Sequence, residues 1–339
     1  MNKPEFSILC PTYNHVPFIS QCIESVLNQS FPDWELLILD DGSTDGTGEM
    51  VRPYLKDQRI RYFFQENKGA GKLAENYNFL LTNAKGSFVT ILEGDDYAEP
   101  DLLAAHHNAF AKNPDAILSF NRVRVDESGH IWEAPSLPKN QFQRDIYENK
   151  PVGNAYNKLF FRCYIPAQGT TVRKSVLVKY GGFEKVEALA TVDYPTWLKL
   201  AQKGGFVFIP KTLATWRRHK EQSTKQRIVP LTQLMLPVFE KVYDELPPEI
   251  LNHVSVTKKF VVHHWSVQFT KILIRGGNYQ LQSKHWKEGR ELYFQSFRQW
   301  PSLLLLWRMK ALLGIIFSLM HIPWMHWYYF VPERILKLF

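Results

Sequence analysis

Short apolar segments alternate with amphipathic segments over residues 1–225, and this alternation constrains the fold more than any other feature. Segments such as FSILC, WELLILD and GSFVTIL are typical of buried strands, and apolar residues recur every three or four positions between them, as in helices. Strands that alternate with helices form mostly parallel, doubly wound sheets. The sequence therefore predicts an α/β fold with a Rossmann-like, mostly parallel sheet flanked by helices.

The chain changes character near residue 225. From Ile228 onward the pattern is helical and is broken by several prolines. Residues 226–339 carry 14 Lys and Arg against 7 Asp and Glu, so they hold almost all of the net charge of +8. We therefore expect one domain over residues 1–225 and a basic, aromatic-rich helical region over residues 226–339. The charge of that region favours an anionic partner.

Two of the expected strands end in acidic clusters. WELLILD closes on Asp40 and Asp41, and the strand GSFVTIL is followed by Glu93, Asp95 and Asp96. Either cluster alone is consistent with a solvated turn. Together, at corresponding ends of neighbouring strands, they favour a ligand site, because ligands of open α/β sheets bind there. Converging carboxylates suit a divalent cation such as Mn²⁺ or Mg²⁺.

Composition narrows the class of protein. Apolar residues make up 45% of the chain and aromatic residues 14%, enough for a folded core. The three cysteines are far apart, which argues against a disulfide framework and against a cysteine-built zinc site. The basic surplus lies in an apolar, aromatic region without an RNA-binding motif, so we expect no nucleic-acid partner. The N-terminus has no signal-peptide core, and we expect it to be cytoplasmic.

The order of these motifs resembles that of the family-two glycosyltransferases, which have the GT-A fold. The matching segments are SILCPTYN, ELLILDDGSTDGT, NAKGSFVTILEGDD, GGF, TVDYPTWLKLAQKG and WRRHKEQST. The resemblance covers about the first 225 residues, and its acidic motifs are specific in combination. It implies an inverting, metal-dependent enzyme that uses a nucleotide-sugar, with a UDP-sugar as the expected donor.

The resemblance also implies which residues bind the donor. Pro11 and Tyr13 would line the nucleotide base, and Asp41 would accept a hydrogen bond from its imide or from the ribose. Asp95 and Asp96 would contact the ribose and hold the cation that bridges the diphosphate. Glu93 stands where the family often has aspartate, and this longer carboxylate would still reach the ribose.

Asp193, in the segment VDYPTW, matches the position of the family's catalytic base. A sugar hydroxyl is a poor nucleophile until its proton is removed, so the reaction needs such a carboxylate. The alternative is that Asp193 caps the helix that follows, and Pro195 makes a cap plausible. Val192 replaces the glutamate that precedes this aspartate in the family.

Three basic side chains are candidates for the phosphate end of the donor. Arg218 and His219 lie in WRRHKEQST, a loop that can close over a diphosphate, with His219 as a further metal ligand. An exposed basic turn is the alternative for this loop. Lys72, in the glycine-rich segment GAGKLA, is a candidate phosphate contact, and a plain loop explains that segment equally well.

The leading hypothesis is therefore a glycosyltransferase that moves a hexose or related sugar to a saccharide or lipid-linked saccharide in surface polysaccharide biosynthesis. The rival hypothesis is a non-catalytic module of the same fold that binds sugar-nucleotides or acts as a scaffold. This rival is supported by Glu93 and Val192, which replace the residues that the family often has at these two positions. A nicotinamide-dependent enzyme is a more distant alternative.

The end of the chain predicts contact with a membrane. The stretch 311–330 approaches the length of about 20 apolar residues that a spanning helix needs, but His and Pro residues interrupt it. Its aromatic residues favour the headgroup region: Trp324, Trp327, Tyr328 and Tyr329. We expect a monotopic anchor on the inner leaflet, so that the protein is cytoplasmic and peripheral. A helical hairpin packed on the first domain is the alternative.

Overall fold

The computed structural model describes residues 3–127, 129–186, 191–219, 228–298 and 305–321. The chain divides into two compact units, Met1–Gln226 with Lys241–Val256, and Arg227–Glu240 with Thr257–Phe339. Residues 241–256 thus belong to the first unit. The separate roles that we assign to residues 1–225 and 226–339 stay a prediction.

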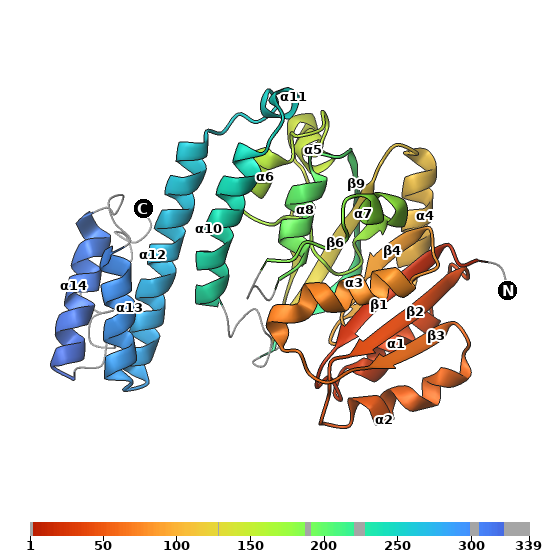
Figure 1. The fold of residues 1–339 in the computed structure, drawn as a ribbon, viewed down its shortest axis with the longest axis horizontal. Coiled ribbons are helices and arrows are strands. Elements are labelled where there is room, and N and C mark those ends of the chain that lie inside the picture. Colours follow the sequence, from red (N-terminus) through yellow and green to blue (C-terminus); the bar gives the residue numbers. More distant parts are fainter. Residues whose placement is uncertain (1–2, 128, 187–190, 220–227, 299–304, 322–339) are drawn as a thin grey trace. The chain divides into compact units, whose positions relative to one another are not determined.

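The first unit contains a nine-stranded sheet among its described residues (Figure 1). The strands are β1 (Phe6–Thr12), β2 (Trp34–Asp40), β3 (Ile60–Phe64), β4 (Phe88–Ile91), β5 (Tyr97–Ala98), β6 (Leu118–Glu127), β7 (His130–Ala134), β8 (Thr171–Arg173) and β9 (Phe206–Arg217). Their order is β3-β2-β1-β4-β8-β6-β9-β5, and β7 pairs with β6.

The first four strands are parallel and end at one edge of the sheet. β1 is parallel to β2 and β4, and β2 is parallel to β3. β8 then joins antiparallel to both β4 and β6, while β6 and β9 run parallel. The predicted α/β fold class is confirmed, and the sheet is more mixed than the alternation alone indicates, because β8 reverses direction between two parallel sets.

Helices cover both faces of this sheet. They are α1 (Ile19–Leu27), α2 (Thr47–Val51), α3 (Leu73–Asn83), α4 (Leu102–Lys112), α5 (Gln141–Tyr147), α6 (Tyr156–Leu159), α7 (Lys174–Lys179) and α8 (Asp193–Leu200), with the 3₁₀ helices η1 (Arg52–Lys56) and η2 (Ala70–Lys72). Ile8 and Cys10 of β1 pack with Cys22 of α1 and with α4. Successive strand residues face opposite sides, so Leu9 points to the other face, where α3 contacts β1 and β2.

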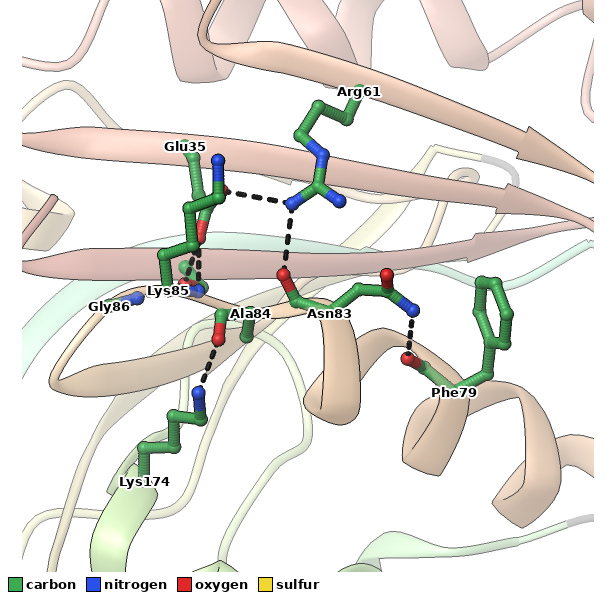
Figure 2. A network of polar contacts seen from close by, with 9 residues as sticks. Glu35, Arg61, Phe79, Asn83, Ala84, Lys85, Gly86 and Lys174 are labelled. Atoms are coloured by element: carbon green, nitrogen blue, oxygen red, sulfur yellow. Dashed lines mark hydrogen bonds and ion pairs between the residues drawn. The ribbon is translucent and has the colours of Figure 1, made fainter. Parts of the chain in front are cut away.

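A polar network fixes the amino ends of these strands, opposite the acidic clusters. The buried Glu35 carboxylate accepts hydrogen bonds from Ser7 Oγ at 2.7 Å and from the Lys85 backbone N–H at 2.5 Å. Arg61 lies 3.5 Å from the same carboxylate and donates to the Asn83 carbonyl at 2.9 Å. Figure 2 shows how this network joins β1, β2 and β3 to the loop between α3 and β4. It holds the strands in register, which positions their carboxyl ends.

The remaining helices follow β9. They are α10 (Ile228–Asp244), α11 (Pro248–Leu251), α12 (Lys258–Gln282), α13 (Trp286–Arg298) and α14 (Leu305–Leu319). In the second unit, α14 packs against α12 and α13. The Tyr293 ring is buried between Gly277 of α12 and Gly314 of α14; a Cβ at Gly277 would come within 2.8 Å of it, and one at Gly314 closer still. Only glycine leaves room for this ring.

No helix within the described residues is both long enough and apolar enough to cross a bilayer. α14 covers the start of the predicted anchor and ends at Leu319. The aromatic residues of that prediction, Trp324, Trp327, Tyr328 and Tyr329, lie outside the described residues.

Candidate active site

The carboxyl ends of β1, β2 and β4 open onto one cavity of about 390 Å³ in the first unit. Its wall includes Pro11 and Tyr13 from the end of β1, Asp41 from the end of β2, and Glu93 and Asp95 after β4. Because these strands are parallel neighbours, the residues that follow them gather at one edge of the sheet. Both acidic clusters therefore contribute to the same cavity.

One end of the cavity has a firmly held carboxylate. Asp41 is buried, and its carboxylate accepts hydrogen bonds from Gln65 Nε2 at 2.5 Å and from the Lys68 backbone N–H at 3.2 Å. Pro11 is buried beside it, whereas the Tyr13 ring is 46% exposed. This end therefore offers a fixed hydrogen-bond acceptor, an apolar surface and an accessible aromatic ring.

The second acidic cluster concentrates its negative charge on one residue. Burial, followed by the charge of Asp95, raises the pKa of Glu93 to about 8, and burial with the charges of both neighbours raises the pKa of Asp96. Burial also acts to raise the pKa of Asp95, but the hydrogen bond with His219 and the charges of His15 and His219 bring it below its ordinary value. Asp95 is thus the carboxylate that stays ionised most readily.

The residues around Asp95 fit a divalent cation. Ligand atoms of His15, Asp95 and His219 lie within 4.8 Å of one another, as do those of Glu93, Asp95 and Asp96. His219 Nε2 is 3.1 Å from Asp95 Oδ2, whereas Asp95 Oδ1 is buried without a hydrogen-bond partner in the described part of the chain. A carboxylate oxygen without a hydrogen-bond partner, beside two imidazoles, offers oxygen and nitrogen ligands to a divalent metal ion.

Asp193 lies on the wall of the same cavity as Glu93 and Asp95. It is the first residue of α8, directly after Val192 at the N-cap position, and its carboxylate also accepts a hydrogen bond from the Tyr194 backbone N–H. The Asp193 carboxylate accepts a hydrogen bond from the Thr191 hydroxyl, and burial raises its pKa. A carboxylate with a raised pKa is better suited to accept a proton than an ordinary surface aspartate.

Three of the predicted site residues do not line the cavity: Asp96, Lys72 and Arg218. Asp96 is fully buried, and its Oδ1 accepts the last backbone N–H of β9 at 2.8 Å. Lys72 Nζ pairs with Glu75 at 2.9 Å, and Arg218 pairs with Glu127 at 3.0 Å. The last two side chains are therefore engaged away from the cavity, whereas His219 next to Arg218 lies on its wall.

The cavity wall also includes residues that the sequence analysis does not single out. His15 joins the Asp95 cluster, with its Nδ1 3.1 Å from Thr12 Oγ1, and Arg162 and Trp216 line other parts of the wall. His15 directly follows PTYN, so its place after the first strand was a usable signal. Trp216 opens the segment WRRHKEQST, whose motif was a usable signal, whereas Arg162 lies far along the chain, where no motif points to it.

A mixed α/β sheet whose strand ends carry carboxylates around a cavity is the architecture of the GT-A proteins. Solved structures with this fold resemble the chain at low sequence identity. S. aureus TarS in complex with UDP-GlcNAc has a TM-score of 0.61 at 14% identity, covering 93% of this chain and 90% of that one. The mannosyltransferase PcManGT from Pyrobaculum calidifontis, in complex with GDP-Man and Mn²⁺, has a TM-score of 0.55 at 18% identity, covering 94% and 88%.

Residues 7–167, just under half of the chain, match the family model of glycosyl transferase family 2. Chondroitin synthase from Escherichia coli is 30% identical over 227 residues, which are 66% of this chain and 30% of that protein. The chain spans half or less of the length of such curated relatives. The family and the GT-A fold predicted from the motifs are thereby confirmed.

Proposed function

We propose that the protein is an inverting, metal-dependent glycosyltransferase that moves a hexose or related sugar from a UDP-sugar to a saccharide or lipid-linked saccharide. The observation that carries the proposal is the shared cavity. One wall combines Asp193 with the Asp95 cluster and with the residues expected to bind a nucleotide. Its relatives include a chondroitin synthase, which favours a role in surface polysaccharide synthesis.

In this proposal Asp193 is the catalytic base. Its carboxylate takes the proton from an acceptor hydroxyl as the hydroxyl oxygen bonds to the anomeric carbon of the donor. The bond from that carbon to the diphosphate breaks on the opposite face, so the configuration inverts. The hydrogen bond from Thr191 orients the carboxylate, and its raised pKa favours proton uptake.

The donor would lie between the strand ends. Pro11 and Tyr13 would contact the nucleotide base, and Asp41 would accept a hydrogen bond from its imide or from the ribose. Glu93 and Asp95 would face the ribose and diphosphate. Mn²⁺ or Mg²⁺ held by Asp95, with His219 and Asp96 nearby, would neutralise charge on the departing diphosphate.

Lys72 and Arg218 stay candidates for binding the phosphates, provided that each leaves its present ion pair when the donor binds. Each now pairs with a glutamate, Glu75 or Glu127, at about hydrogen-bond distance. Ion pairs that are partly exposed contribute little stability, so an incoming diphosphate can compete for either side chain.

We further propose that the protein binds the inner leaflet of the cytoplasmic membrane through α14. Met309, Leu312, Ile316 and Leu319 recur on one helical face and are 40–59% exposed, whereas the opposite face packs inside the second unit. The positive surplus of residues 226–339 complements anionic headgroups. An apolar helix face in a basic surrounding suits an anionic lipid surface rather than an aqueous partner.

The function is tested by incubating the purified protein with a panel of nucleotide-sugars, with and without Mn²⁺, and measuring release of nucleoside diphosphate. Release that requires the metal supports the proposal. Binding of nucleotide-sugars without release of nucleoside diphosphate from any member of the panel would favour the scaffolding module instead.

A further inference from the structure

Arg162 is the one arginine or lysine on the cavity wall among the described residues. The wall also carries four carboxylates: Asp41, Glu93, Asp95 and Asp193. The cavity therefore combines four carboxyl groups with a single permanently charged cation, and the group that this cation binds indicates the chemical class of the substrate.

Other basic side chains near the cavity are already engaged. Lys72 and Arg218 pair with glutamates, and Arg217 donates to the Asp95 carbonyl at 2.6 Å. Arg162, by contrast, is exposed, and its side chain makes no hydrogen bond or ion pair within the described part of the chain. Its guanidinium is therefore available to a ligand that enters the cavity.

Arg162 lies at the Asp193 end of the cavity. It follows α6, and the Tyr194 hydroxyl donates to the Leu159 carbonyl of that helix, which joins α6 to the start of α8. Arg162 comes three residues after Leu159, and Asp193 directly precedes Tyr194, so this hydrogen bond joins the two segments on the same cavity wall. A molecule that places a hydroxyl at Asp193 thus brings its neighbouring groups towards Arg162.

We propose that Arg162 binds an anionic group of the acceptor, a carboxylate or a phosphate, so that the enzyme glycosylates an anionic saccharide. A guanidinium matches either group with two parallel hydrogen bonds, which a neutral sugar cannot form. The proposal rests on the proposed function, because it places the acceptor hydroxyl at Asp193. It goes further by stating the chemical class of the acceptor.

The test measures binding by ligand-observed NMR titration of the full chain with UDP and the diamagnetic cation Mg²⁺ present. The probes are methyl β-D-glucuronide, glucose 6-phosphate and the neutral methyl β-D-glucoside. We expect at least one anionic probe to bind about tenfold or more tightly than the neutral one. Arg162→Gln should abolish this preference and Arg162→Lys should keep part of it. Preference for the glucuronide indicates a uronic acid acceptor, and preference for the phosphate indicates a phosphorylated one.

Arg144→Gln is the matched control, since Arg144 lies on α5 away from the cavity wall and pairs with Glu148 at 3.6 Å. It should leave the preference unchanged. Equal binding of neutral and anionic probes, or a preference that survives Arg162→Gln, overturns the inference. A loss of UDP affinity in Arg162→Gln without any acceptor probe also overturns it, because Arg162 would then serve the donor.

Release of nucleoside diphosphate from the nucleotide-sugar panel is measured in parallel. Anion preference through Arg162 without any release would overturn the proposed function and leave the anion site standing. Release without anion preference would overturn the inference about the acceptor alone.

Discussion

Replacing Asp193 with asparagine separates its chemical role from its structural one. The asparagine side chain has nearly the same shape, and its amide oxygen still accepts the hydrogen bond from the Thr191 hydroxyl. The change removes proton acceptance and little else. A positioned general base contributes about 100- to 10,000-fold in rate, or about 2.7–5.4 kcal/mol in activation free energy. Turnover of Asp193→Asn should fall by that factor while the affinity for the donor persists.

The same substitution has a pH-dependent effect on stability. Burial raises the pKa of Asp193, so the folded state binds this proton more tightly than the unfolded state does. Stability contributed by the carboxyl group therefore falls as pH rises from the unfolded pKa, about 3.9, through the raised folded pKa. At neutral pH the ionised carboxylate is a cost that asparagine does not have. Asp193→Asn should melt at a higher temperature than the wild type at pH 7, and the difference should shrink towards pH 4.

The assay follows nucleoside diphosphate release and transfer across pH 4–9, with melting curves for both proteins. Wild-type turnover should decline on the acid side, where Asp193 becomes protonated. Asp145→Asn is the control, because Asp145 is a half-buried residue of α5 that is not part of the cavity wall, and its carboxylate accepts a hydrogen bond from Gln141. Near-normal turnover in Asp193→Asn would remove Asp193 from the mechanism.

Further perturbations test the metal site, the polar network at Glu35 and the helix α14. A chelator should abolish diphosphate release, and Mn²⁺ should restore it. Asp95→Ala should remove the metal dependence of donor binding. Full activity in excess chelator would contradict the metal site. Glu35→Ala leaves the donors around it without an acceptor and should lower the free energy of unfolding by about 1–3 kcal/mol without changing donor affinity, which urea unfolding and UDP titration would check. Exchanging Leu312 and Ile316 for Asp should reduce sedimentation with anionic liposomes while leaving diphosphate release intact. Separately, Gly314→Ala should lower the melting temperature, because the added methyl group crowds the buried Tyr293 ring. Unchanged sedimentation of the double variant would argue against the α14 face.

Much of the first unit could be predicted from local patterns. The strands β1, β2 and β4 and their helices follow from apolar periodicity, because a fully buried strand needs a continuous apolar run. The acids at the strand ends also stand out in the sequence, since Asp40 and Glu93 end such runs and further acids follow each of them. Their common edge follows from parallel pairing, which the alternation of strands and helices predicts.

The partners of the site residues could not be predicted in this way. His219 approaches Asp95 across 124 residues of sequence, and β8 inserts antiparallel between β4 and β6. Such pairings depend on how the whole chain packs, so no local pattern records them. Arg218 likewise pairs with Glu127 across 91 residues of sequence, whereas Lys72 pairs with Glu75 only three residues away, a local contact typical of helical spacing.

The sequence by itself determined the elements, the family and the carboxylates that the reaction needs, because these depend on residue type and spacing. The tertiary structure decided which of those residues share a cavity. In the folded chain, Asp96 is buried and accepts a backbone hydrogen bond from β9, and His15 lies close to Asp95. Arg162 is exposed on the cavity wall, at the end of the cavity where Asp193 lies. The physical reason is that burial and charge act through space, and distances in space are set only when sheet and helices have packed.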